Sequence, residues 1–252
     1  MVNAIEVIHF INDYLAIDVF DDYCPNGLQV QGRNRVNHIV TGVTASQALL
    51  DKAVVNKADL IVVHHGYFWK NEDPIIVGPM RQRLQTLLKH DINLLAYHLP
   101  LDVHSVIGNN HLLGDLLGIV NVHRYPVSGV PDLLSVGEFE SAILATDLAN
   151  LIESKLSRKP LHIQSGAGPI KKIAWCTGAA QDMLTAAADY DVDAFITGEV
   201  SERTVHMARE LGVDFYAAGH HATERFGVQA LADLLPTKFD VTCEFIDIDN
   251  PV

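Results

Sequence analysis

Apolar runs rich in β-branched residues alternate along this chain with stretches that have helical spacing. Residues 39–43 and 60–63 are apolar runs typical of strands, and between them Ala48, Leu49 and Ala53 form the apolar stripe of a helix. A second helix is predicted over residues 80–90, followed by a strand over 93–97. Alternating strands and helices imply right-handed crossovers and mainly parallel sheets, so we expect an α/β fold.

The same pattern occurs a second time. Residues 38–66 align without gaps on residues 172–200, a shift of 172 − 38 = 134, with identical residues at six pairs of positions. Each copy reads as strand, turn, helix and strand, with the second copy's elements at 173–176, 181–190 and 194–197; a helix and a strand follow it at 201–211 and 214–218. We therefore expect two similar α/β halves, which form an internal repeat.

The composition changes between the two copies. From residue 125 to residue 168 prolines and glycines surround short strand-like pieces and one predicted helix over 148–156. We interpret residues 1–124 as the first half, 125–168 as a connecting segment with some local structure, and 169–252 as the second half.

Size, charge and cysteine content narrow the class of protein. With 252 residues, 48% of them hydrophobic, the chain can bury one large core or two modest ones. The net charge of −13 disfavours binding to a phosphate backbone, and no apolar run approaches the roughly 18 residues needed to span a bilayer. Three distant cysteines form neither a disulfide framework nor a thiolate zinc site. We expect a cytoplasmic protein with no membrane or nucleic-acid partner.

Two histidine pairs stand where apolar runs end. His64 and His65 precede Gly66, and His220 and His221 follow Gly219. Functional groups gather beyond the carboxyl ends of parallel strands, so we expect these imidazoles to face solvent and to meet there. Adjacent side chains on a strand point to opposite faces, so His64 and His65 can share a site only past the strand's end, or by binding two neighbouring metals.

Carboxylates accompany both pairs. Asp102 follows Pro100, which turns the chain, and is predicted to lie in a loop at the same sheet edge, as a ligand or as a turn residue. Glu224 lies four residues after His220 and is either a ligand beside it or a residue of a helix's first turn; His221 could replace His220 in that pairing. Glu199 aligns with His65 in the repeat and either supports a ligand or faces solvent.

Imidazole and carboxylate ligands without thiolate favour zinc, iron, manganese, cobalt or nickel over calcium or magnesium. Five candidate ligands, His64, His65, Asp102, His220 and Glu224, are too many for a three-ligand catalytic zinc and too few to saturate two metals. The count favours two divalent metal ions with a bridging carboxylate and open positions for water. Because imidazole must be neutral to coordinate, metal should be lost as the pH falls through about 6.5.

Several strings of the sequence closely resemble the Nif-three-like family, also called GTP cyclohydrolase I type 2 homologues, over nearly the whole chain. They are YCPNGLQVQG, IVTGVTASQALLDKA, VVHHGYFW, YHLPLD, FITGEVSE and YAAGHHATER. The resemblance implies a dinuclear metal centre ligated by His64, His65, Asp102, His220 and Glu224, without substitution at any of the five. It also implies two similar halves facing each other across the metals and a toroidal homo-hexamer.

Two functions are compatible with these features. The first is a metal-dependent hydrolase of a small polar or nucleotide-like substrate, in which His98 or Glu199 assists as a base or supports a ligand. The second is a non-catalytic, metal-dependent regulatory, binding or metal-handling protein. The absence of a Walker sequence and of a dinucleotide fingerprint keeps this second function open.

Overall fold

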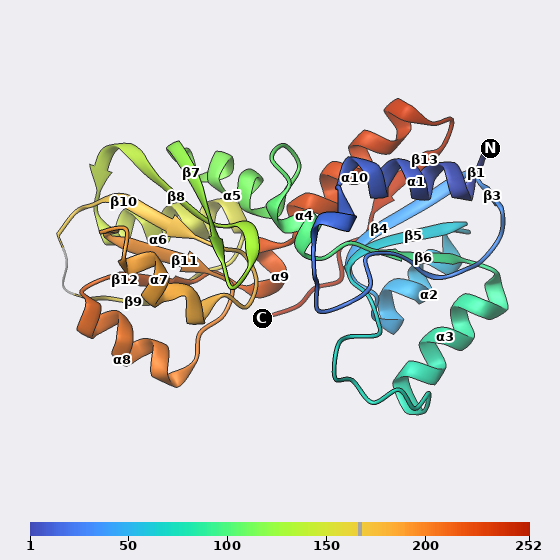
Figure 1. Cartoon of the computed structure of the whole chain (residues 1–252), viewed down its shortest axis with the longest axis horizontal. Helices are drawn as coiled ribbons and strands as arrows, with labels where there is room; N and C mark the ends of the chain where they lie inside the picture. Colours follow the sequence, from blue (N-terminus) through green and yellow to red (C-terminus); the bar gives the residue numbers. More distant parts are fainter. Residues whose placement is uncertain (166–167) are drawn as a thin grey trace. The chain divides into compact units, whose positions relative to one another are not determined.

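The structure, a computed structural model, describes residues 1–165 and 168–252, and it divides into two compact units (Figure 1). The first unit comprises Met1–Leu101 and Gly227–Asp249, and the second comprises Asp102–Phe226 and Asn250–Val252. The chain passes between the units within α4 (Leu99–Val103), within α10 (Arg225–Lys238) and again between Asp249 and Asn250.

The first unit contains a five-stranded sheet of order β13-β4-β5-β6-β2. The first four strands in this order pair in parallel, and β2 is antiparallel to β6. Helices α1 and α10 lie on one face of the sheet and α2 and α3 on the other (Figure 1). The strands are β13 (Thr242–Phe245), β4 (His38–Thr44), β5 (Leu60–His65), β6 (Asn93–Ala96) and β2 (Gly27–Val30), and the other elements are α1 (Ala4–Tyr14), α2 (Gln47–Val55), α3 (Gly78–His90), β1 (Val2–Asn3) and β3 (Arg35–Val36).

Local sequence explains these elements. The residues of β5 up to His64 are buried, as expected of an apolar central strand between two layers of helices. Helix α2 begins after Ser46, whose hydroxyl accepts a hydrogen bond from the backbone N–H of Leu49, and α3 has a proline in its first turn. Leu49 packs with Leu87 and Val63 in the core beneath these helices.

The second unit contains a six-stranded sheet of order β7-β8-β10-β11-β12-β9. Its core surrounds the fully buried Trp175, whose indole N–H donates to the backbone carbonyl of Asn110. The strands are β7 (Val120–Val127), β8 (Val130–Ile143), β9 (Leu161–Ile163), β10 (Ile170–Trp175), β11 (Ala194–Thr197) and β12 (Asp214–Ala217), and the helices are α5 (Asn109–Leu117), α6 (Ala145–Leu156), α7 (Leu184–Ala188), α8 (Glu202–Leu211) and α9 (His220–Thr223).

The α/β architecture is confirmed, but the expectation of mainly parallel sheets is wrong for the second unit. Among the pairings of its described strands, β10–β11 and β11–β12 are parallel, whereas β7–β8, β8–β10 and β12–β9 are antiparallel. The cause is the segment that we interpreted as a connection: its strands extend the sheet at both edges. Gly166 of that segment lies outside the described residues.

The observed units also differ from the expected boundaries. Strand β13 returns to the first unit and pairs in parallel with β4, because β4 offers an open hydrogen-bonding edge there. The two aligned sequence copies correspond to β4–α2–β5 and to β10–α7–β11, and both strand pairs are parallel. A repeat relationship between the whole halves stays a prediction.

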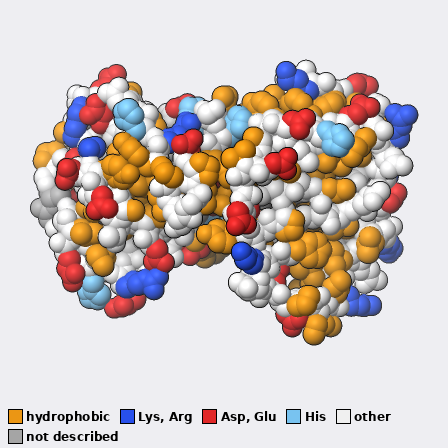
Figure 2. Space-filling view, viewed as in Figure 1, with side chains coloured by type: hydrophobic (Ala, Val, Ile, Leu, Met, Phe, Trp, Pro, Cys, Tyr) orange, Lys and Arg blue, Asp and Glu red, His pale blue; other side chains and the backbone are white. Residues whose placement is uncertain are grey.

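Every described helix is too short or too polar to cross a lipid bilayer. Figure 2 shows acidic, basic and apolar side chains interspersed over the visible face. The excess of acidic residues is therefore not gathered into a single patch on that face.

We predict that Leu49→Ala lowers the free energy of unfolding of the first unit by about 2–5 kcal/mol, because it leaves a cavity between α2 and the sheet. Val55→Ala on the same helix is the matched control, since Val55 is 77% exposed, and it should change that free energy by less than about 0.5 kcal/mol. Urea denaturation of both variants measures the difference. Equal losses would contradict this packing.

Candidate metal centre

Three imidazoles of the first unit gather beyond the carboxyl ends of β5 and β6. His64 and His65 are the last two residues of β5, and His98 follows the neighbouring parallel strand β6. Their ring centroids are 4.5 Å apart for His64 and His65, 5.2 Å for His64 and His98, and 5.9 Å for His65 and His98. One ring nitrogen from each histidine lies within 4.8 Å of the other two, which is close enough for a metal ion to be held among them.

Hydrogen bonds orient the first pair. The Nδ1 atom of His64 lies 2.9 Å from the backbone carbonyl of Tyr97, so the neutral ring donates from Nδ1 and keeps its lone pair on Nε2. The Nδ1 atom of His65 lies 3.3 Å from the hydroxyl of Thr44 on β4. The expectation that both imidazoles face solvent is wrong for His64, which is fully buried because its ring lies against the adjacent strand end.

His98 is held by a residue that sequence reasoning missed. The carboxylate of Asp22 lies 2.7 Å from Nδ1 of His98, and it also accepts hydrogen bonds from the backbone N–H of Leu99 and from the amide of Asn26. Asn26 in turn accepts from the backbone N–H of His98. Burial acts to raise the pKa of Asp22. The hydrogen bond from His98, the charge of His98 and the hydrogen bonds from Asn26 and Tyr23 outweigh burial, so the pKa is lowered overall. The YCPNG string, which directly follows Asp22, was the available signal.

Cys24 lies in the same loop as Asp22. Its sulfur, a carboxylate oxygen of Asp22 and a ring nitrogen of His98 all lie within 4.8 Å of one another. Burial and the charge of Asp22 raise the pKa of the Cys24 thiol to about 12. The side chain therefore remains a protonated thiol at neutral pH, and a thiol is a poor metal ligand.

In the second unit, a histidine lies between two glutamates. His220 begins α9 directly after Gly219; its Nε2 lies 3.0 Å from Glu224 and its Nδ1 lies 2.6 Å from Glu199. The spacing of four residues thus does bring His220 and Glu224 together. Gly178 lies directly against this pair. A β-carbon at position 178 would overlap the Glu224 carboxylate, so a larger residue does not fit there.

These contacts set the charge of His220. Burial lowers its pKa, but the hydrogen bonds and negative charges of Glu224 and Glu199 outweigh burial and raise the pKa to about 9. A metal ion that binds His220 must displace this proton. At His220, protons therefore compete with metal from about pH 9 downward, well above the value of about 6.5 expected from an unperturbed imidazole.

Asp102 lies in α4, not in the predicted loop, because the turn after Pro100 is helical. Its carboxylate is nearly buried and accepts hydrogen bonds from the amide of Asn109 at 2.9 Å and from the hydroxyl of Thr177 at 3.2 Å. Burial and the charges of Asp102 and Glu224 raise the pKa of Cys176 well above its usual value. Both carboxylates thus act on one buried thiol, and a cation near them would relieve the cost of burying their charges.

Two neighbours of His220, His221 and Thr223, are buried. His221 is nearly buried, and its backbone N–H donates to the carbonyl of Val252. The hydroxyl of Thr223 donates to the carbonyl of Gly219 and accepts from the backbone N–H of Gly178.

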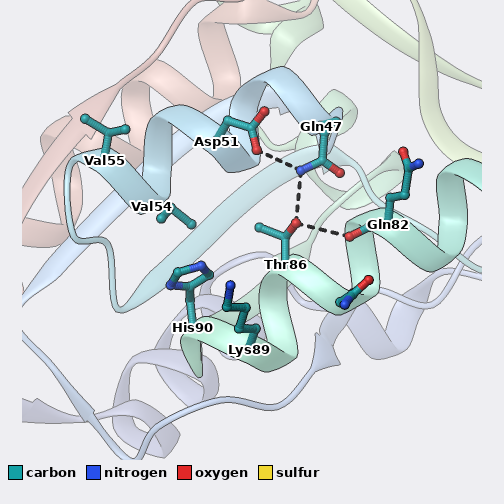
Figure 3. Close-up of a pocket in the computed structure, with 9 residues that line it drawn as sticks. Gln47, Asp51, Val54, Val55, Gln82, Thr86, Lys89 and His90 are labelled. Carbon is teal, nitrogen blue, oxygen red and sulfur yellow. Dashed lines mark hydrogen bonds between the residues drawn. The ribbon is translucent and has the colours of Figure 1, made fainter.

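A separate hollow of about 570 Å³ lies between α2 and α3, and none of the predicted site residues lines it (Figure 3). The amide of Gln47 donates to Asp51 and to Thr86 there, and the Thr86 hydroxyl donates to the carbonyl of Gln82. Gln47, Asp51 and Thr86 of this hollow thus hydrogen-bond with one another. The histidine clusters remain the candidate site.

The donor set of both units fits divalent transition metals. The imidazoles of His64, His65 and His220 and the carboxylates of Asp102 and Glu224 are groups that suit zinc, iron, manganese, cobalt or nickel. Burial raises the pKa of the Cys24 and Cys176 thiols, so both are protonated in the metal-free chain.

Comparison with known proteins identifies the family of the chain. The model of the Duf34/NIF3 (NGG1p interacting factor 3) family matches residues 2–251. The chain belongs to this family. Among relatives, the "GTP cyclohydrolase 1 type 2 homolog" of Yersinia pestis is 52% identical over 248 residues and that of Escherichia coli (strain K12) is 51% identical over 247 residues; the alignments cover 98% of each chain.

Solved structures of the family share the fold. The protein ybgI, described as of unknown function, superposes with a TM-score of 0.94 at 51% identity and covers 99% of this chain and 100% of its own. TTHA1606 from Thermus thermophilus gives a TM-score of 0.89 at 34% identity, with coverage of 99% and 100%. The family relationship predicted from the sequence is therefore confirmed over the full chain.

We predict that Glu199→Gln moves the pKa of His220 in metal-free protein from about 9 toward the ordinary 6.5, because one of the two carboxylates that raise it loses its charge. Since the folded-state pKa is raised, the charge on His220 stabilises metal-free protein fully below about pH 6.5, and this contribution is lost as the pH rises through about 9. Nuclear magnetic resonance titration of the imidazole after chelation measures the shift.

Glu202→Gln is the matched control for this titration, because it removes the carboxylate of the exposed His206–Glu202 pair. The pKa of His220 should not change in that variant. An unaltered His220 titration in Glu199→Gln would show that Glu199 does not act on it.

Proposed function

We propose that the chain binds two divalent metal ions through His64, His65, Asp102, His220 and Glu224, and that it hydrolyses a small polar or nucleotide-like substrate. The observation that carries the proposal is the convergence of imidazole nitrogens at the ends of β5 and β6. The close His220–Glu224 pair supports it, and so does family membership over the full chain. A homo-hexameric toroid accompanies the proposal as an expectation from the resemblance, and a cytoplasmic location accompanies it as an expectation from the sequence composition.

The ligand types decide what the site can do. Bound divalent metals act as Lewis acids that activate water and polarise a substrate oxygen. The chain's own part is to orient the nitrogen lone pairs, and two of the proposed ligands have a clear partner for this: the carbonyl of Tyr97 for His64 and the carboxylate of Glu199 for His220. These fixed orientations favour a preformed site.

His98 is the residue best placed to move a proton. Asp22 accepts from its Nδ1, so Nε2 is the basic nitrogen, and the ring lies beside both histidines of β5. An imidazole oriented by a buried carboxylate is suited to accept a proton from water and to return it to a leaving group. Glu199 is engaged with His220, so we assign it the orientation of that ring.

We predict that elemental analysis of protein purified without an affinity metal finds two ions per chain in the wild type and fewer in His64→Ala and in Glu224→Ala, because each variant removes a proposed ligand. His206→Ala is the control, since His206 is exposed and pairs only with Glu202 among its described contacts. Circular dichroism checks that each variant is folded. Full metal content in both ligand variants would contradict the assignment.

We predict that His98→Ala keeps both metals but slows hydrolysis by about 10²-fold or more, the usual contribution of a general acid–base group. The assay is a panel of nucleotides, pterins and esters with metal-loaded protein, and His111→Ala is the control. If metal-loaded wild-type protein turned over no member of the panel, the non-catalytic binding or metal-handling function would replace the hydrolase.

A further inference from the structure

Two aromatic side chains of the first unit, Trp69 and Tyr23, lie beside His98, and Trp69 also lies beside His65. The ring of Trp69 stands edge-on to His98 with centroids 4.9 Å apart and at 5.9 Å from His65, and Tyr23 lies 6.3 Å from His98. Phe68 directly precedes Trp69 in the chain. The rings of Tyr23, Phe68 and Trp69, named here the aromatic wall, are not buried: Tyr23 is 54% exposed, Phe68 is 42% exposed and Trp69 is half-buried.

Hydrogen bonds fix the wall in place. The backbone N–H of Lys70 donates to the carbonyl of Tyr23, which joins the two loops that carry the rings. The side chain of Gln29 joins them again, because its amide group donates to the carbonyls of Pro25 and Tyr67 and its carbonyl accepts from the N–H of Tyr67. The indole N–H of Trp69 donates to the carbonyl of Gly66. The wall is therefore preorganised on the protein side.

The backbone at Phe68 adds a second observation. Its φ of 64° lies in the left-handed region, which costs energy for a bulky residue and which glycine would adopt without strain. This conformation keeps a large apolar ring substantially exposed to water. A strained backbone and an exposed aromatic ring are both features that concentrate at ligand-binding sites.

We propose that the aromatic wall binds a planar heteroaromatic ring of the substrate, as in a nucleobase or a pterin, by stacking beside the metal site. This inference rests on the proposed function, because it places the ring next to His98 and His65. Every such ring has a π-face, and stacking on an aromatic side chain typically strengthens binding by about five- to a hundredfold per contact.

Isothermal titration calorimetry on metal-loaded full-length protein tests the wall. The probes are guanosine 5′-monophosphate, ribose 5-phosphate, which lacks the base, and neopterin, which lacks the sugar phosphate. We expect the nucleotide or neopterin to bind at least tenfold more tightly than ribose 5-phosphate. Trp69→Ala and Phe68→Ala should each weaken binding of the ring on the order of tenfold. Tyr125→Ala, which removes a ring that stacks on Tyr190 in the second unit, should have no effect.

Tryptophan emission gives an independent readout, because Trp69 is half-exposed and the other tryptophan, Trp175, is fully buried in the second unit. Binding of the ring should quench emission in the wild type. In Trp69→Phe the quenching should disappear while calorimetry still detects binding, since phenylalanine retains an aromatic face.

Metal content measured on the same samples separates the two proposals. Variants of the wall that keep two metals but bind the ring as tightly as the wild type would overturn the inference and leave the metal site intact. A change of oligomeric state in Phe68→Ala and Trp69→Ala, with unchanged ring binding, would instead identify the wall as a contact between copies of the chain and would equally overturn it. Loss of metal from the wild type would refute the proposed function itself.

Discussion

Parallel pairing of neighbouring strands is the constraint on which the candidate site depends. In the first unit β5 and β6 run side by side in register, so the residues that follow them emerge at one edge of the sheet. This brings His98 to His64 and His65 although more than thirty residues separate them. In the second unit β11 and β12 are paired in the same way, and they bring Glu199 to His220. Antiparallel pairing of either strand pair would send these side chains to opposite edges.

The second level of organisation is the orientation of each imidazole by a buried or half-buried acceptor. A carbonyl fixes His64, Asp22 fixes His98, and Glu199 fixes His220. These acceptors determine which ring nitrogen carries the proton, which is the property that separates a ligand or base from an ordinary surface histidine. The three acceptors belong to different loops and strand ends. A functional histidine in this fold is therefore the product of at least two chain segments.

The sequence predicted those parts of the fold that depend on local pattern. The apolar runs of β4 and β5, the spacing of Leu49 and its neighbours in α2, and the four-residue separation of His220 and Glu224 all have local signals, and the structure contains each of them. Strand partners and side-chain partners do not have such signals. The antiparallel edges of the second sheet, the return of β13 and the Asp22–His98 pair join residues far apart in the chain, and only tertiary contacts select them.

The return of β13 has a consequence for synthesis of the chain. Strand β4 forms early from residues 38–44, but its outer edge is paired only by residues 242–245. During translation this edge has no β13 beside it until residues 102–226 of the second unit have been made, and an uncovered parallel edge invites pairing with another chain. When the chain folds as it is synthesised, the first sheet therefore stays incomplete while the strands of the second sheet can already pair. Destabilising substitutions in β4 carry a greater risk of aggregation during synthesis than equally destabilising substitutions in β11.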